Sequence, residues 1–191
     1  MSKNYTKGGK IWSLMKTRCS DSSRYSIEKT TYKYCQNHFK DFQNFMDWCQ
    51  TQQAYLLTGD TGRWQLDKDV LIKNNKVYSP ETCAFLPSYI NGIFGNCVKK
   101  TELPLGVNFR ERFGKFVAQS NIGGKRKHLG HFNCPNDAHR AWQTSKVQSI
   151  KAALEQYSNS FGSRQDICRA LQERVLLITQ DIESEQETLS I

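Results

Sequence analysis

The sequence has no long hydrophobic run. Its longest uncharged stretch, residues 82–98, contains a proline, two glycines and two asparagines, so it is too polar and too broken to cross a bilayer as a helix. Residues 1–5 form no apolar segment of the signal type. The seven cysteines are odd in number and scattered, unlike the framework of a secreted disulfide scaffold. We therefore expect an intracellular, cytoplasmic protein with reduced thiols and no membrane partner.

Acidic residues are few outside the C-terminal part of the chain. The net charge is +9, yet residues 163–191 hold three arginines against six acids. Residues 99–127 carry eight lysines and arginines against only Glu102 and Glu111. A basic centre of this kind either binds the phosphates of a nucleic acid or forms a solvated surface. The hydrophobic content of 38% and the aromatic content of 12% are sufficient for one domain or two small ones.

Residues 1–98 form the first predicted domain. Apolar residues from Ile11 to Met15 predict one helix, and those within residues 37–50 predict an amphipathic second helix. Residues 64–71 and 76–78 read as the two strands of a hairpin. Ser79 would then cap a helix with Pro80 at its first position, before a helical or extended segment at 82–86.

Residues 99–105 form a predicted basic linker, and residues 106–158 form a second domain. Alternating residues at 108–112, 115–122 and 126–132 predict a three-stranded antiparallel sheet. A helix should open at residues 134–137, with an apolar stripe that includes Ala138, Trp142 and Ile150. The predicted fold class is thus α+β: a strand–helix module with flanking helices, a three-stranded antiparallel sheet packed on a helix, and a C-terminal helix.

Residues 159–191 predict that acidic, amphipathic C-terminal helix. Ser163 and Asp166 have the spacing of a capping box. Apolar residues then recur at helical intervals from Ile167 through Leu171 to Ile182. The stripe either packs within the chain or provides a surface for self-association or a protein partner.

The alternation of side chains divides the predicted sheet into two faces. Phe116, Ala118 and Leu129 should face the helix. The side chains expected on the other face are basic or polar; they are Lys115, Gln119, Asn121, Arg126 and His128, with Val117 and Gly130 beside them. Such side chains contact phosphates and base edges in the major groove of DNA, which a sheet can enter as a helix can.

The second domain resembles the plant ethylene-response-factor (Apetala-type) DNA-binding domain. The residues that carry the resemblance are Gly106-Val107, Arg110, Gly114-Lys115-Phe116, Leu129-Gly130-His131-Phe132, Asp137-Ala138 and Ala141-Trp142. The resemblance implies that the exposed sheet face reads double-stranded DNA. By position, the DNA-contacting residues would be Asn108, Arg110, Arg112, Gln119, Asn121, Arg126 and His128. This chain departs from the family at His128, where the plant domains have tryptophan.

The first domain resembles phage HNH homing endonucleases. Residues 12–19, 39–48, 66–69 and 78–87 carry the resemblance. It implies a ββα module in which Asp67, with Asp69 and Thr82, holds a divalent metal such as Mg²⁺ or Mn²⁺. Lys68 falls at the position of the general-base histidine, so the implied catalytic set is Asp67, Lys68 and Asp69. Asn74 or Asn75 would match the middle asparagine.

Two residues depart from functional HNH enzymes, and both departures bear on cleavage: Lys68 replaces the general-base histidine, and Thr82 stands at the position of a metal-binding asparagine or histidine. A lysine near neutral pH is an acid rather than a base, and threonine is a poor ligand for a hard cation. The sequence therefore predicts a phage-type, sequence-specific DNA-binding protein that acts inside a bacterial host cell and either cuts DNA with a divalent metal or no longer cuts. The alternatives are an inactive DNA-binding regulator, an anti-defence protein derived from such a nuclease, or a protein-interaction module.

Several cysteines of the first domain could bind zinc. Cys35 and His38 are three positions apart, and with Cys19 and Cys83 they would complete a tetrahedral site. Cys49 could replace Cys19 or Cys83 as a ligand. Because no second closely spaced pair is present, these cysteines could equally be small core residues.

Overall fold

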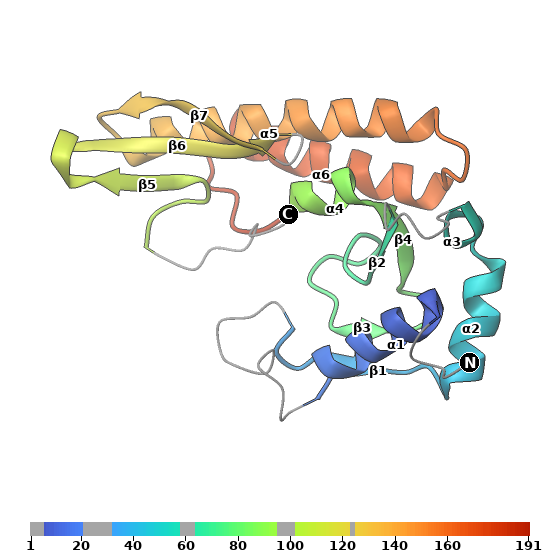
Figure 1. Cartoon of the computed structure of the whole chain (residues 1–191). Helices are drawn as coiled ribbons and strands as arrows, with labels where there is room; N and C mark the ends of the chain where they lie inside the picture. Colours follow the sequence, from blue (N-terminus) through green and yellow to red (C-terminus); the bar gives the residue numbers. More distant parts are fainter. Residues whose placement is uncertain (1–5, 21–31, 58–63, 95–101, 123–124) are drawn as a thin grey trace. The chain divides into compact units, whose positions relative to one another are not determined.

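The computed structural model describes residues 6–20, 32–57, 64–94, 102–122 and 125–191 (Figure 1). Contacts divide the chain into two compact units, Met1–Pro87 and Ser88–Ile191, which we describe separately. Helices and strands are present in both units, and the predicted α+β class is confirmed. Of the predicted linker at 99–105, residues 99–101 lie outside the described part.

The helices in the described part of the first unit are α1 (Lys7–Arg18), α2 (Phe42–Thr51) and α3 (Gln53–Leu57). The side chain of Thr6 caps α1 by accepting a hydrogen bond from the Gly9 amide at 3.1 Å. Asp41 caps α2 in the same way through the Asn44 amide at 2.8 Å. Because Asp41 fixes the start of α2, this helix begins five residues later than the sequence pattern indicated.

The short strands described in the first unit form two pairs. Strand β1 (Gln36–Asn37) runs parallel to β3 (Val77–Tyr78), and β2 (Trp64–Asp67) runs antiparallel to β4 (Ala84–Pro87). The predicted hairpin between 64–71 and 76–78 is therefore wrong, since each strand pairs with a different partner.

Of the helical or extended segment predicted at 82–86, the extended alternative is observed as β4, whereas residues 79–82 form a turn and Ser79 caps no helix there. The Thr82 hydroxyl stabilises this turn by accepting a hydrogen bond from the Ser79 amide at 3.1 Å and donating one to the Val77 carbonyl at 2.7 Å.

Aromatic rings fill the core of the first unit. Phe45 is fully buried, and its ring lies edge-on to Phe39 at a centroid distance of 5.1 Å. Trp48 stacks on Phe85 at 5.6 Å and thereby joins α2 to β4. Helix α1 approaches α2 closely at Gly8, where a Cβ atom would lie 2.2 Å from the sulfur of Met46.

The second unit contains the predicted sheet. Its strands are β5 (Val107–Arg110), β6 (Lys115–Ile122) and β7 (Lys125–Phe132), hydrogen-bonded antiparallel in that order. Each lies within two residues of its predicted position, because the alternation of side chains and the flanking glycines are strong local signals.

The α-helices described in the second unit are α4 (Ser88–Phe94), α5 (Pro135–Ser158) and α6 (Gln165–Glu183). Figure 1 shows α5 along one face of the sheet and α6 beside α5. Gly106, with a φ of +78°, leads into the sheet where a Cβ would lie 1.9 Å from the Trp142 ring. This close approach fixes the first strand against α5.

The C-terminal part of the second unit differs from its prediction in two details. Ser163 does not cap α6; Arg164 occupies the cap position, and the Ser163 hydroxyl donates to the Ser158 carbonyl at 3.4 Å. The helix ends at Glu183, and residues 184–191 follow it as a C-terminal segment that begins with a turn at residues 184–185. The apolar stripe of α6 is buried within the unit at Ile167, Leu171 and Ile178.

Candidate nucleic-acid interface

One face of the sheet packs on helix α5. Val107 and Ala118 are buried together with Ala138 of α5, and Phe116 and Leu129 pack against them. Directly opposed residues of an antiparallel pair point to the same side of a sheet. The strand register therefore identifies which residues lie on the opposite side.

That opposite side collects basic and amide side chains on neighbouring strands. Arg110 lies opposite Lys115, Gln119 opposite His128, and Asn121 opposite Arg126. These residues are exposed or partly exposed. Together with two further side chains in the same register, they form what we name the outward face: Asn108, Arg110, Lys115, Gln119, Asn121, Arg126, His128 and His131.

A β-bulge changes the predicted composition of this face. The register shifts between Ala118 and Gln119, so Leu129 has no direct partner and Gly130 lies opposite Ala118. Gly130 was predicted on the outward face, but its register puts it on the side of the helix.

The same shift puts His131 opposite Val117. His131 therefore lies on the outward face, where the sequence did not predict it. Its ring lies 4.7 Å from that of His128. A glycine inside a strand pattern, as at Gly130, is the signal that could have indicated the bulge.

Arg112 lies beside the outward face rather than on a strand. Strand β5 ends at Arg110, and residues 111–113 form a 3₁₀ turn that closes at Gly114 with a φ of +57°. The predicted strand through residue 112 is thus too long by two residues. The Arg112 guanidinium lies 5.5 Å from the centre of the Phe113 ring.

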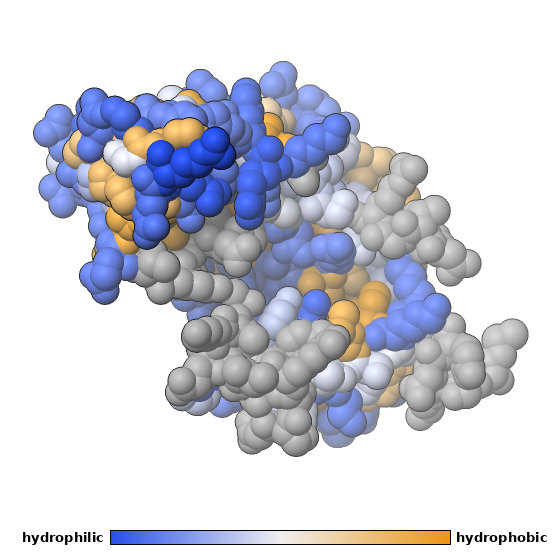
Figure 2. Space-filling view, turned by 60° about the vertical axis from the view of Figure 1, so that its left-hand side comes forward, coloured by the Kyte–Doolittle hydropathy of each residue, from blue (hydrophilic) through white to orange (hydrophobic). Residues whose placement is uncertain are grey.

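The turn between β5 and β6 exposes aromatic surface. Phe109 and Phe113 are 46% and 57% exposed, and the Phe113 ring lies edge-on to His131 at 5.6 Å. Figure 2 brings this end of the sheet forward and shows hydrophobic surface beside strongly hydrophilic surface.

Positive charge on the outward face has few acidic neighbours. Among the described residues, Arg110 and Arg126 take part in no ion pair. The nearest acid along the chain is Glu111 for Arg110 and Asp137 for Arg126. Lys115 donates a hydrogen bond to the Asn133 side chain, which positions its ammonium group at the end of the sheet. The face can therefore present guanidinium, ammonium and amide donors to an anionic partner.

Of the predicted metal and catalytic residues, Asp67 ends β2, Lys68 and Asp69 lie in the loop between β2 and β3, and Thr82 lies in the turn after β3. Oδ1 of Asp67 accepts hydrogen bonds from the backbone amides of Asp69 and Val70, at 2.8 and 2.7 Å. Burial raises the pKa of Asp67, and the neighbouring carboxylate of Asp69 raises it further. The main role of Asp67 in this structure is therefore to accept the hydrogen bonds that hold the start of this loop.

Lys68 is buried in this loop, with 3% of its surface exposed. Its ammonium group donates to the carboxylate of Asp69 and, at 2.9 Å, to the carbonyl of Asn75. The Asn75 amide donates in turn to the carbonyls of Lys68 and Val77. An ammonium group already paired with Asp69 makes this donor set a poor fit for a divalent cation.

Thr82 does not join the two aspartates in a ligand set. Its hydroxyl is engaged in the turn at 79–82 described above, and no three His, Cys, Asp or Glu residues of the described ranges form a group that could hold a metal. The nuclease residues stay a prediction from the resemblance.

The cysteines predicted to bind zinc separate into two neighbourhoods. The thiol of Cys19 lies near that of Cys35, and the thiol of Cys49 lies near that of Cys83. Burial raises the pKa of Cys19 to about 11 and that of Cys83 to about 12, so both thiols are protonated near neutral pH. His38 is exposed, and its Nε2 lies 3.0 Å from Oε1 of Gln36. This arrangement favours core packing for the buried thiols, while zinc binding stays a prediction.

Comparisons with protein-family models, with curated proteins and with solved structures find no match to this chain. In the part of the chain that the structure describes, no helix combines the length and the apolar character needed to span a membrane.

Proposed function

We propose that this protein binds double-stranded DNA in a sequence-specific manner through the outward face of β5, β6 and β7. The observation that carries the proposal is the register that places Arg110, Arg126 and Gln119 on one face while α5 covers the other. Arginine can bond two acceptors of guanine at once, and asparagine and glutamine can do the same with adenine. The resemblance to the ethylene-response-factor domain points to the same face.

The proposal treats the first unit as a module without cleavage activity. Lys68 stands where an HNH enzyme needs a histidine, and it is buried against Asp69 and the Asn75 carbonyl. The hydrogen bonds of Asp67 give that carboxylate a structural role. A regulatory DNA-binding protein therefore fits these observations better than a metal-dependent nuclease.

Fluorescence anisotropy with labelled mixed-sequence duplexes tests the binding claim. Arg110→Ala combined with Arg126→Ala should weaken binding by about 2 kcal/mol, because two phosphate or base contacts are lost. The double variant should stay folded since both side chains are exposed. The matched control is Lys151→Ala with Arg169→Ala, which removes the same charge from exposed helix positions of the same unit. Equal affinities of the two folded double variants would refute the assignment.

A plasmid assay separates binding from cutting. Wild-type protein, incubated with supercoiled plasmid and Mg²⁺ or Mn²⁺, should shift the plasmid on a gel without nicking it. Metal-dependent nicking that disappears in Asp67→Ala would overturn the non-catalytic account and restore the nuclease hypothesis.

A further inference from the structure

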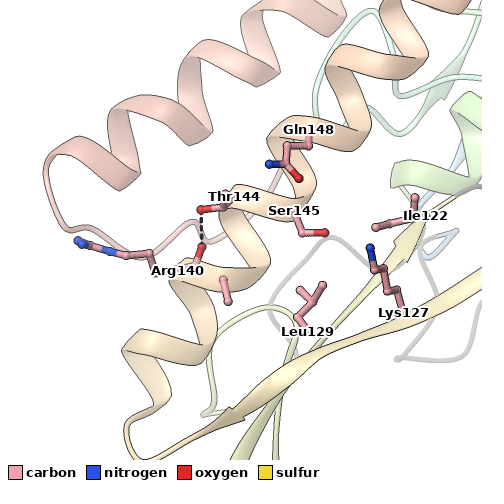
Figure 3. A pocket seen from close by; sticks show the side chains of 8 residues that line it. Ile122, Lys127, Leu129, Arg140, Thr144, Ser145 and Gln148 are labelled. Carbon is pink, nitrogen blue, oxygen red and sulfur yellow. Dashed lines mark hydrogen bonds between the residues drawn. The ribbon is translucent and has the colours of Figure 1, made fainter.

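A cavity of about 330 Å³ opens on the helix side of the sheet, between α5 and the ends of β6 and β7. Figure 3 shows it from close by. Its apolar wall comes from Ile122, Leu129 and Ala141, and its polar lining includes Lys127, Ser145 and Gln148. The volume lies at the lower end of the range seen for small-molecule sites, so any occupant is small.

Ser145 brings an unused hydroxyl into this cavity. The residue is 6% exposed, and its Oγ has no hydrogen-bond partner among the described residues. Nearby hydroxyls on α5 behave differently: Thr144 donates to the Arg140 carbonyl at 2.9 Å, and Ser149 donates to the Ser145 carbonyl at 2.8 Å. A buried hydroxyl without a partner costs free energy, and an acceptor from outside the protein would remove that cost.

Lys127 supplies positive charge on the opposite wall. It lies opposite Ser120 in the register. Lys127 is therefore on the helix side of β7, unlike its neighbours Arg126 and His128. Figure 3 shows its ammonium group and the Ser145 hydroxyl pointing toward one another, while the Arg140 side chain turns away. The guanidinium of Arg140 pairs instead with Glu185 at 3.2 Å. Lys127 is therefore the cation directed into the cavity.

We propose that this cavity binds a small carboxylate with a short apolar tail. A carboxylate can accept a hydrogen bond from the Ser145 hydroxyl and pair with the Lys127 ammonium, and such charge-assisted bonds are the stronger kind. The tail would lie against Ile122 and Leu129. Because the cavity is on the opposite side of the sheet from the outward face, the proposal does not depend on DNA binding.

Hexanoate serves as the probe, with 1-hexanol and hexylammonium as controls of the same chain length. Amide NMR spectra of the full chain are recorded during each titration. Hexanoate should shift the signals of Ile122, Leu129 and Ser145 along a saturable curve and bind about tenfold more tightly than hexanol, since hexanol lacks the charge. Hexylammonium should leave these signals unchanged.

Two variants test the polar pair. Lys127→Met and Ser145→Ala should each weaken hexanoate binding about fivefold or more, whereas Lys151→Met, on an exposed position of α5, should not. Ser145→Ala removes only an unpartnered hydroxyl, so it keeps the test decisive even if Lys127→Met fails to fold. Hexanol binding as tight as that of hexanoate, or unchanged hexanoate affinity in Ser145→Ala, would overturn the proposal. So would hexanoate shifts confined to the outward face.

Discussion

Polar residues of the β2–β3 loop bond mainly to the loop itself. Asp67 accepts two amide hydrogen bonds, and Asn75 donates two to backbone carbonyls. Lys68 places a charge in a nearly buried position, where Asp69, the Asn75 carbonyl and the rings of Tyr32 and Tyr78 compensate for lost hydration. Each side chain therefore contributes to the conformation of the loop, and each is a sensitive point for substitution.

Asp67→Asn tests the structural role of this carboxyl group. Burial raises the pKa of Asp67 above its ordinary value of 3.8, so folding favours the protonated form. The contribution of this group to stability is fully present below that value and is lost as pH rises through the folded-state pKa. The amide oxygen of asparagine can accept the same two hydrogen bonds without the charge. We expect the variant to be as stable as wild type, or more stable, near neutral pH.

Urea denaturation of both proteins between acid and neutral pH measures the difference. The stability advantage of Asp67→Asn should grow as pH rises above the ordinary carboxyl pKa. Asp67→Ala, which cannot accept the two hydrogen bonds, serves as the contrast and should lose about 1–3 kcal/mol. A marked loss of stability in Asp67→Asn at neutral pH would show that the negative charge itself is needed.

At the scale of elements, helix α6 and the C-terminal segment after it hold the second unit together. Thr188 is fully buried in that segment. Its hydroxyl donates to Asp181 at 2.6 Å and accepts from Gln143 at 3.0 Å. Its backbone amide donates to Nε2 of His139, whose Nδ1 donates to the carbonyl of Leu105 at 2.9 Å. These bonds connect the segment before β5 and the C-terminal segment to α5.

Truncation after Gly162 should unfold the second unit. It removes Ile167, Leu171 and Ile178, which are all fully buried. Burying each such side chain contributes roughly 1.5–3 kcal/mol, and a whole domain is stable by only about 5–15 kcal/mol. Circular dichroism and amide NMR of the truncated chain measure the outcome. A native-like melting transition and dispersed spectrum would contradict this role of α6.

Thr188→Val should destabilise the unit by about 1–3 kcal/mol, because it leaves Asp181 and Gln143 without a shared partner. Thr179→Val is the matched control, since that hydroxyl only donates to the Val175 carbonyl of its own helix. The control should cost well under about 1 kcal/mol. The denaturation midpoints of the two variants measure this difference. Equal midpoints would show that the Thr188 hydroxyl does not contribute to stability.

Local patterns predicted the second unit well and the first unit poorly. The strands at 107–110, 115–122 and 125–132 follow from alternation and nearby glycines, which act over a few residues. The pairing of β2 with β4 joins residues about twenty positions apart, and no local pattern indicates such a contact. Likewise the bulge at Leu129 reverses the side of Gly130 and His131, which simple alternation could not predict.

At the scale of the whole molecule, the charge distribution matches the proposed division of roles. The net charge is +9, although residues 163–191 are acidic. The basic residues of the outward face lie on the sheet, whereas α6 packs against α5. A cationic face on a positively charged protein attracts DNA from a distance, and such attraction depends on salt.

The salt dependence of DNA binding tests the central claim most directly. The affinity of wild-type protein for one duplex is measured by anisotropy between about 50 and 200 mM salt, beside the Arg110→Ala/Arg126→Ala variant. The logarithm of the wild-type affinity should fall linearly with the logarithm of salt concentration. The variant's slope should be shallower by up to about 2, about 1 for each arginine that contacts a phosphate. Affinity that does not change with salt, or identical slopes for both proteins, would contradict DNA binding through the outward face.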